Sequence, residues 1–345
     1  MEKNRILVTG GTGYIGSHTV VELQQAGYEV VIIDNLSNSN IDVLDGIEAI
    51  TGMRPAFVEG DVTNIETLKS LFDTYSGIKG IINFAASKAV GESIEKPSLY
   101  YRNNLVSLLN LLDLMGPNGV EGIVFSSSCT VYGEPDRNPV TEETPIKTAT
   151  SPYGNTKQIS EEIITDMIRS GAPFKSVILR YFNPVGAHSS ALIGELPNGV
   201  PQNLVPYLTQ TAIGIRKELS VFGNDYDTPD GSCIRDFINV VDLAKAHVIA
   251  VNRMLDGKSE QPVEIFNLGT GDGVSVLQLI ESFERSTGVK VPYRIAPRRP
   301  GDIVKVWADP TRANKVLGWK TEISLDDTMR SAWNWQLKLR ERGIM

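Results

Sequence analysis

The chain has 345 residues and a formal net charge of −8, and hydrophobic residues make up 41% of it. This acidic balance argues against general nucleic-acid binding, although a few arginines and backbone amides are enough to hold an anionic substrate. The length and the ordinary composition fit a soluble enzyme with one large domain, or two smaller domains that share a core.

The cysteine content and the lack of long apolar runs bear on the compartment. The two cysteines, Cys129 and Cys233, imply no disulfide framework, and no metal-ligand spacing links them to the three histidines. The start of the chain lacks a basic and then apolar leader, and no apolar run reaches the length of a membrane span. We therefore expect a cytoplasmic protein without a metal site and without a membrane contact.

The first 34 residues predict a strand, a tight turn, a helix and a second strand. An apolar run at 5–9 leads into Gly10, Gly13 and Gly16, where the glycines suit a sharp turn, the approach of a pyrophosphate, and close helix packing. The second apolar run ends at Asp34, whose carboxylate suits ribose hydroxyls and would repel a 2′-phosphate. This pattern predicts NAD rather than NADP, the alternative being a glycine-rich turn without a ligand.

Apolar runs then alternate with helical patterns through the first half of the chain. This alternation predicts an α/β fold, a Rossmann-type doubly wound parallel sheet with ligands at the carboxyl ends of its strands. The expected strands lie near 5–9, 29–33, 56–59, 79–84, 121–126 and 176–180, and the expected helices near 14–26, 40–51, 64–74, 98–115 and 153–170.

After about residue 181 the pattern loosens, and proline and glycine become frequent. We expect residues 1–180 to form an NAD-binding Rossmann domain that also receives a later segment near 235–255. Residues 181–345 would form mainly a smaller α/β substrate domain. Its expected elements are helices at 240–256, 275–286 and 325–341 and short strands at 220–222 and 263–266.

Tyr153 and Lys157 are the candidate catalytic pair. They stand four residues apart at the start of a predicted helix, so they share one face of it. A phenol is a poor base at neutral pH, and a nearby ammonium together with a positive nicotinamide would favour its ionised form. The spacing alone is weak evidence, because Tyr75 and Lys79 repeat it in a loop, where we interpret it as chance.

Ser128 and Thr130 add hydroxyls at the end of the strand near 121–126. They could hydrogen-bond a substrate hydroxyl and relay its proton, or they could simply close a polar strand end with a turn.

Several stretches together resemble the UDP-galactose 4-epimerase family of the extended short-chain dehydrogenase/reductase superfamily. The likeness runs from residue 5 to about residue 335. It rests on the glycine turn, on Ser128 or Thr130, on Tyr153 with Lys157, and on the runs at 88–93, 180–188, 222–226 and 296–302.

The resemblance implies reversible inversion at C4 of a UDP-hexose through a transient 4-ketose, with NAD as cofactor and a homodimer as the assembly. The implied catalytic residues are Tyr153, Lys157, Ser128 and Thr130. The implied cofactor residues are Gly10, Gly13, Tyr14, Ile15, Gly16, Asp34, Asn35, Asp61, Val62, Phe84, Ala85, Lys88, Asn103, Tyr153, Lys157 and Tyr181. The implied substrate residues are Ser128, Tyr153, Asn183, Asn203, Leu204, Phe222, Arg235, Arg299, Asp302 and Val306.

Some alternatives stay open at this point. Two arginines suit a diphosphate, but Arg235-Asp236 could also be a surface ion pair. A nucleotide-sugar 4,6-dehydratase would need an acid–base carboxylate pair beside Thr130, where this chain has Cys129 and Val131. A uronate epimerase, a decarboxylase, and an NAD-binding protein without catalysis are further candidates.

Three positions depart from the family pattern. Ala86-Ser87 replaces Gly-Leu, Phe237 replaces a frequent tyrosine, and Val306 replaces a frequent bulky tyrosine. Within the family, a smaller residue at this last position goes with a pocket that also admits N-acetylated hexoses. The resemblance therefore implies that UDP-N-acetylglucosamine and UDP-N-acetylgalactosamine are accepted as well.

Overall fold

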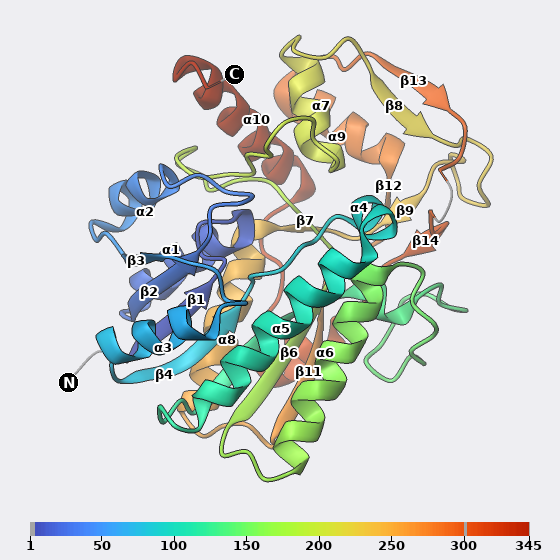
Figure 1. Cartoon of the computed structure of the whole chain (residues 1–345). Helices are drawn as coiled ribbons and strands as arrows, with labels where there is room; N and C mark the ends of the chain where they lie inside the picture. Colours follow the sequence, from blue (N-terminus) through green and yellow to red (C-terminus); the bar gives the residue numbers. More distant parts are fainter. Residues whose placement is uncertain (1–3, 300–301, 345) are drawn as a thin grey trace.

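The computed structural model describes residues 4–299 and 302–344, and a seven-stranded sheet organises it (Figure 1). All neighbouring strands of this sheet are parallel. Their spatial order is β3 (Ala56–Glu59), β2 (Glu29–Asp34), β1 (Arg5–Thr9), β4 (Ile78–Asn83), β5 (Gly122–Ser128), β6 (Lys175–Tyr181) and β11 (Val263–Leu268). The order reverses beside β1, which is the switch point where doubly wound sheets bind ligands.

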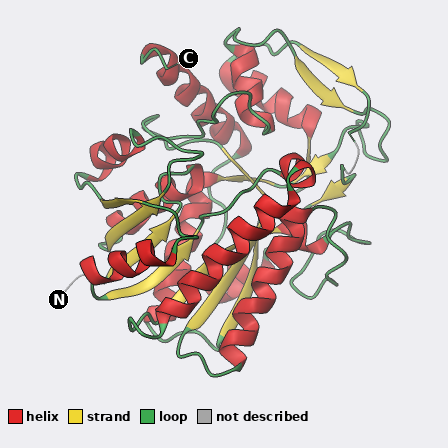
Figure 2. Cartoon of the chain, viewed as in Figure 1, coloured by secondary structure: helices red, strands yellow, loops and turns green. Residues whose placement is uncertain are grey.

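Helices cover both faces of this sheet, as Figure 2 shows. One apolar core cluster joins the sheet to α1 (Tyr14–Gln25), α2 (Val43–Thr51) and α8 (Val240–Leu255). A second cluster joins the opposite face to α3 (Ile65–Thr74), α5 (Pro97–Met115) and α6 (Pro152–Arg169). The inner strands are buried from both sides, and for this reason their sequences are largely apolar runs, whereas the edge strand β3 is only partly buried.

A smaller region packs against the carboxyl end of the sheet and has its own apolar core. Its helices are α7 (Leu204–Ala212), α9 (Val276–Thr287) and α10 (Leu325–Glu341). Its strands form three small sheets: β8 (Leu219–Phe222) with β13 (Tyr293–Ala296), β7 (Asn183–Val185) with β10 (Phe237–Asn239), and β9 (Ile234–Arg235) between β12 (Val274–Ser275) and β14 (Lys305–Val306).

The predicted α/β class and the predicted parallel sheet are confirmed. The sequence did not predict the short helix α4 (Val90–Glu95), α7, the 3-10 turn η1 (Cys129–Tyr132), the π-helical turn η2 (Ala313–Leu317), or most of the short strands of the smaller region. Elements of two or three residues carry too little periodicity to be recognised in a sequence.

The chain returns to the large sheet after residue 235. Helix α8 packs on α1, and β11 pairs with β6 to become the edge strand of the sheet. Because β11 lies beyond the segment near 235–255, more of the C-terminal half joins the large sheet than the sequence predicts.

Candidate active site

The glycine turn between β1 and α1 is shaped for close contacts. Gly10 has a left-handed φ of +70°, and a Cβ built there would come within 2.8 Å of the Ala85 nitrogen. A Cβ at Gly16 would come within 2.3 Å of the Gly10 carbonyl oxygen. Gly13 stands at the N-cap of α1 and provides no capping side chain. The first amides of α1 therefore stay free to bind a phosphate, and the cradle fits a dinucleotide.

The carboxylate of Asp34 lies at the end of β2, directly beside this turn. Its oxygens accept hydrogen bonds from the backbone amides of Thr12 and Leu36, at 3.2 and 2.9 Å. Nearby, the Asn35 amide donates to Asp61 at 3.3 Å. The side chain of Val62 is buried in the core, so only its backbone can meet a ligand.

The end of β4 forms the second wall of the predicted cofactor path. The Ala85 amide donates to the Thr9 hydroxyl, and the ring of Phe84 packs against His247 with 4.8 Å between centroids. Asn103 on α5 donates to the Ser87 hydroxyl at 3.0 Å. The Phe84 ring and the α5 amide thus converge on the loop that carries Lys88.

Glu195 is a buried carboxylate that sequence reasoning missed. It accepts a hydrogen bond from the Asn203 amide at 2.6 Å, and the Lys88 ammonium lies 3.9 Å away. Burial raises the pKa of Glu195, and the Lys88 charge and the Asn203 hydrogen bond oppose that shift. The carboxylate joins a predicted cofactor residue to a predicted substrate residue, and Leu204 begins α7 immediately after Asn203.

The candidate catalytic pair lies at the start of α6, which begins where its sequence predicts. Ser151 caps the helix by accepting a hydrogen bond from the Gly154 amide at 3.1 Å, and Pro152 follows in the first turn. This start directs Tyr153 and Lys157 toward the end of β5. The Lys157 ammonium donates to the Ser126 carbonyl oxygen at 2.6 Å and lies 5.8 Å from the centre of the Tyr153 ring.

Burial sets the protonation of this pair. It raises the pKa of Tyr153 to about 12, although a hydrogen bond with Ser128 opposes the rise. It also lowers the pKa of Lys157 to about 8, against the attraction of Glu161. In the protein alone, therefore, the ammonium does not bring the pKa of the phenol into the neutral range, and the shift that we expect from the sequence also needs the positive nicotinamide.

The hydroxyls near β5 have distinct surroundings. Ser128 accepts a hydrogen bond from the Thr130 amide and so closes the turn η1, as the structural alternative proposes, while it also contacts Tyr153. The Thr130 hydroxyl oxygen is buried without a hydrogen-bond partner. The Tyr181 hydroxyl instead bonds to that of Ser126.

Arg235 and Asp236 do not form a surface ion pair. Asp236 is fully buried, and its carboxylate accepts hydrogen bonds from the backbone amides of Thr270 and Ala308 at 2.9 and 3.1 Å. The Arg235 guanidinium donates only to the neighbouring Ile234 carbonyl, and no carboxylate pairs with it among residues 4–299 and 302–344. Its charge is thus available to an anion, while the Asn183 amide donates to the Asp236 carbonyl oxygen.

Arg299 is held differently from Arg235. Its guanidinium makes two hydrogen bonds with the Asp302 carboxylate, at 3.0 and 3.1 Å, and it lies 4.6 Å over the ring of Phe222. The predicted substrate residues of this segment therefore contact one another at the tip of the smaller region.

Val306 lies in a small apolar cluster beneath η1. Only 3% of its surface is exposed, and it packs with Tyr132, Phe182 and Ala308, with Cys129 against the cluster. Through β14 it pairs in register with Arg235 of β9. The residue at position 306 therefore pairs with the strand of Arg235 and packs against the turn η1 that follows Ser128.

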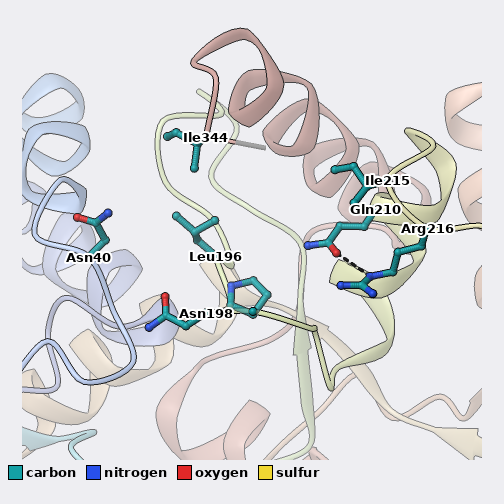
Figure 3. Close-up of a pocket in the computed structure, with 9 residues that line it drawn as sticks. Asn40, Leu196, Asn198, Gln210, Ile215, Arg216 and Ile344 are labelled. Atoms are coloured by element: carbon teal, nitrogen blue, oxygen red, sulfur yellow. Dashed lines mark hydrogen bonds between the residues drawn. The ribbon is translucent and has the colours of Figure 1, made fainter.

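Three other features bear on the function. The cavity in Figure 3, about 450 Å³, is lined by residues such as Asn40, Leu196 and Arg216, none of which belongs to the predicted site. Within the described part of the chain, no group of three or more His, Cys, Asp or Glu side chains could hold a metal ion. No described helix is long and apolar enough to span a membrane.

Known proteins resemble this chain over nearly its whole length. The UDP-glucose 4-epimerase of Dictyostelium discoideum is 50% identical over 333 residues, which cover 96% of each chain. The chain belongs to the UDP-glucose 4-epimerase family. A family model described as GDP-mannose 4,6 dehydratase also matches residues 7–332, so the epimerase family shares its scaffold with dehydratases.

Solved structures agree with the epimerase assignment. The epimerase of Bifidobacterium longum in complex with NAD⁺ and UDP has a TM-score of 0.93 and 47% identity, over 97% of this chain and 98% of that one. The Stenotrophomonas maltophila epimerase with bound NAD and formylated UDP-arabinopyranose has a TM-score of 0.94 and 47% identity, over 98% and 99%. A more distant structure, at 36% identity and TM-score 0.82 over 97% and 99%, is the UDP-Glc/GlcNAc 4-epimerase of Campylobacter jejuni.

A buried polar network behind the catalytic pair also escaped sequence reasoning. Glu161 on α6 accepts hydrogen bonds from Ser127 and, at two points, from Arg180. Arg180 also donates to the Tyr132 hydroxyl, which bonds to Asn267 on β11. One signal was present in the sequence, because Glu161 follows Lys157 at the spacing that separates Lys157 from Tyr153.

Proposed function

We propose that this protein is an NAD-dependent 4-epimerase that interconverts UDP-glucose and UDP-galactose. One observation carries the proposal: Tyr153 and Lys157 share one face of α6 beside Ser128 at the end of β5, in a chain half identical to named epimerases. The absence of an Asp-Glu pair around Thr130 speaks against the dehydratase alternative.

In the proposed reaction, Tyr153 removes the proton from the C4 hydroxyl of the sugar, directly or through Ser128. The chemistry that NAD supplies when bound is reversible acceptance of the hydride from C4. Lys157 stabilises by its charge the phenolate form of Tyr153 that accepts this proton. The 4-ketose turns while its nucleotide stays anchored, and Tyr153 returns the proton after the hydride has reached the opposite face.

We assign the remaining predicted residues to two binding regions, one for the cofactor and one for the nucleotide part of the substrate. The glycine turn, Asp34 and Asn35, Asp61 and Val62, the Phe84 wall, Asn103 and Tyr181 would hold the cofactor. Arg235, Arg299 with Asp302, and the start of α7 would hold the diphosphate and uridine. The sugar then has fewer fixed contacts than the nucleotide, which permits it to turn.

The decisive experiment is incubation of the purified protein with UDP-galactose and no added NAD, followed by separation of the products. We expect UDP-glucose at equilibrium, because the cofactor should co-purify with its buried cradle. The matched control is Tyr153→Phe. If a folded, NAD-loaded protein forms no UDP-glucose, the proposed function is wrong.

A wider substrate range is the second proposal, and Val306 favours it. The valine is smaller than the tyrosine that many family members carry at this position, and it packs in an apolar cluster with Tyr132 and Phe182. We expect the sugar pocket beside this cluster to admit an acetamido group on C2. We expect turnover of UDP-N-acetylglucosamine and UDP-N-acetylgalactosamine in addition to the two plain hexoses. Activity on the plain pair alone would contradict this proposal.

We also propose a homodimer through α5 and α6, which lie side by side in Figure 1. On α5, Leu99, Val106 and Leu109 are 45%, 36% and 40% exposed, which is a high apolar content for a solvated helix face. Sedimentation equilibrium should give twice the 37.8 kDa chain mass, and Val106→Glu should reduce it to the monomer. A monomeric wild-type protein would refute the proposal.

A further inference from the structure

The helix α6 carries a third ionisable group on the face that holds the catalytic pair. Tyr153, Lys157 and Glu161 follow one another at intervals of four residues, so they form one line along the helix. Glu161 is buried, with 7% of its side chain exposed. A buried carboxylate costs stability unless it is paired. The partners of Glu161 therefore indicate what this residue contributes.

Glu161 ties α6 to the two strands that end at the site. Its Oε1 accepts from the Ser127 hydroxyl of β5 at 2.5 Å and from Arg180 Nε of β6 at 2.9 Å. Its Oε2 accepts from the second nitrogen of Arg180 at 2.5 Å. Ser127 lies between Ser126, whose carbonyl receives the Lys157 ammonium, and Ser128, which contacts Tyr153.

Lys157 is a buried cation with few partners. Its ammonium has one hydrogen bond, to the Ser126 carbonyl oxygen, and it lies 4.9 Å over the ring of Phe125. Burial lowers the pKa of Lys157 to about 8 even though the negative charge of Glu161 opposes this shift. Without that charge, a larger share of Lys157 would be neutral at physiological pH.

Among the described residues, no carboxylate forms an ion pair with Lys157, and Glu161 is the anion whose charge acts on it. Four other titratable or charged groups act on Tyr153 or Glu161: Arg180 and Tyr181 on β6, Cys129 on η1 and Tyr100 on α5. Tyr132 on η1 lies against Arg180, and Glu92 on α4 lies against Tyr100. The Glu92 carboxylate is already bound to Lys96 and to the Tyr100 hydroxyl. Arg180 is a cation, and unpaired it would disfavour the charged form of Lys157.

We propose that Glu161 is a positioning residue for the proposed epimerase reaction: it fixes α6 against β5 and β6 and keeps Lys157 positively charged beside Tyr153. The proposal rests on the proposed function, because Lys157 stabilises the phenolate there. Glu161 acts through Lys157 and does not touch the sugar or the cofactor. Its pairing with Arg180 keeps a buried cation from acting against Lys157.

The test variant is Glu161→Gln, which keeps the shape of the side chain and removes its charge. The chain offers a matched control in Glu264→Gln, because Glu264 makes an equally buried two-point pair with Arg253, at 2.7 and 2.8 Å, on β11 and α8. Both variants take a buried carboxylate charge away from an arginine, although Arg253 keeps a second carboxylate, that of Glu260, at 3.8 Å. Only Glu161 lies on the helix face that carries Lys157. The comparison therefore separates a general loss of stability from a specific effect on Lys157.

The first readout is the pH dependence of turnover of UDP-galactose. In Glu161→Gln we expect the rise of kcat with pH to move upward by about one unit, with kcat lower by about tenfold below the transition and KM changed by less than about twofold. Glu161→Asp should restore most of the wild-type profile, since it retains the charge. Glu264→Gln should lower the melting temperature and leave the profile in place.

The second readout needs no turnover. In protein labelled with ¹³C-lysine, the Cε signal of Lys157, assigned by its loss in Lys157→Met, reports the pKa of Lys157 directly. We expect that pKa to fall by about one unit in Glu161→Gln. If the first variant does not fold, Arg180→Met serves instead, and the pKa of Lys157 should then rise because a repelling cation is gone.

The proposal would be overturned if the pKa of Lys157 were unchanged in both Glu161→Gln and Arg180→Met. It would also be overturned if Glu264→Gln shifted that pKa as much as Glu161→Gln does. This result is distinct from failure of the proposed function. A wild-type protein that does not convert UDP-galactose would refute the epimerase assignment, whereas the lysine titration would still decide whether Glu161 controls the charge of Lys157.

Discussion

Replacement of Tyr153 by phenylalanine tests the core of the proposed chemistry, because it removes one oxygen and little else. The pKa of Tyr153 is raised to about 12 by burial in the protein alone. At pH 7 this leaves only about one phenol in 10⁵ ionised, so the group can act as a base only where nearby positive charge stabilises its anion. The positive charges available are Lys157 and the nicotinamide ring.

The structural cost of Tyr153→Phe should be small. The lost hydrogen bond to Ser128 is worth about 1 kcal/mol, and the Ser128 hydroxyl keeps its bond from the Thr130 amide. The variant should therefore fold, retain NAD and bind UDP as the wild type does. Loss of a general base lowers rates by about 10²- to 10⁴-fold, and we expect kcat for UDP-galactose to fall within that range.

The assay compares kcat and KM for UDP-galactose with UDP binding measured separately by calorimetry. A fall in kcat with unchanged UDP affinity assigns the loss to chemistry. A kcat within threefold of wild type would refute the role of the phenol. A fall accompanied by loss of bound NAD would show that the Tyr153 hydroxyl holds the cofactor and would leave the base unidentified.

Three further changes test other parts of the site. Lys157→Met should move the rise of kcat with pH upward, because loss of the ammonium raises the pKa of Tyr153; a superimposable pH profile would contradict this coupling. Gly16→Val should abolish copurified NAD, because a Cβ there lies 2.3 Å from the Gly10 carbonyl oxygen, and absorbance of the released cofactor measures it. Val306→Tyr should reduce kcat/KM for UDP-N-acetylglucosamine by about 10- to 200-fold relative to UDP-glucose, and equal losses for both sugars would refute the steric argument.

The architecture of the large sheet was predictable because its inner strands are buried on both faces. Such strands appear as unbroken apolar runs, and glycine and acidic residues mark their ends, as Gly10 and Asp34 do after β1 and β2. The smaller region was not predictable in detail. Its strands of two or three residues, such as β9 and β14, are defined by pairing between distant segments, which leaves no periodic signal in either.

Arg235-Asp236 could be an anion-binding arginine or a surface ion pair, and the sequence alone does not decide between these two interpretations. Adjacent residues on an extended chain point to opposite sides, so a neighbouring cation and anion are not thereby a pair. Here Asp236 points inward, where backbone amides of Thr270 and Ala308 satisfy it. Arg235 then lacks the partner that the sequence places beside it. Burial of Asp236 therefore leaves the Arg235 guanidinium without a carboxylate beside it, and this separation depends on β9, β14 and the 269–271 loop meeting in space.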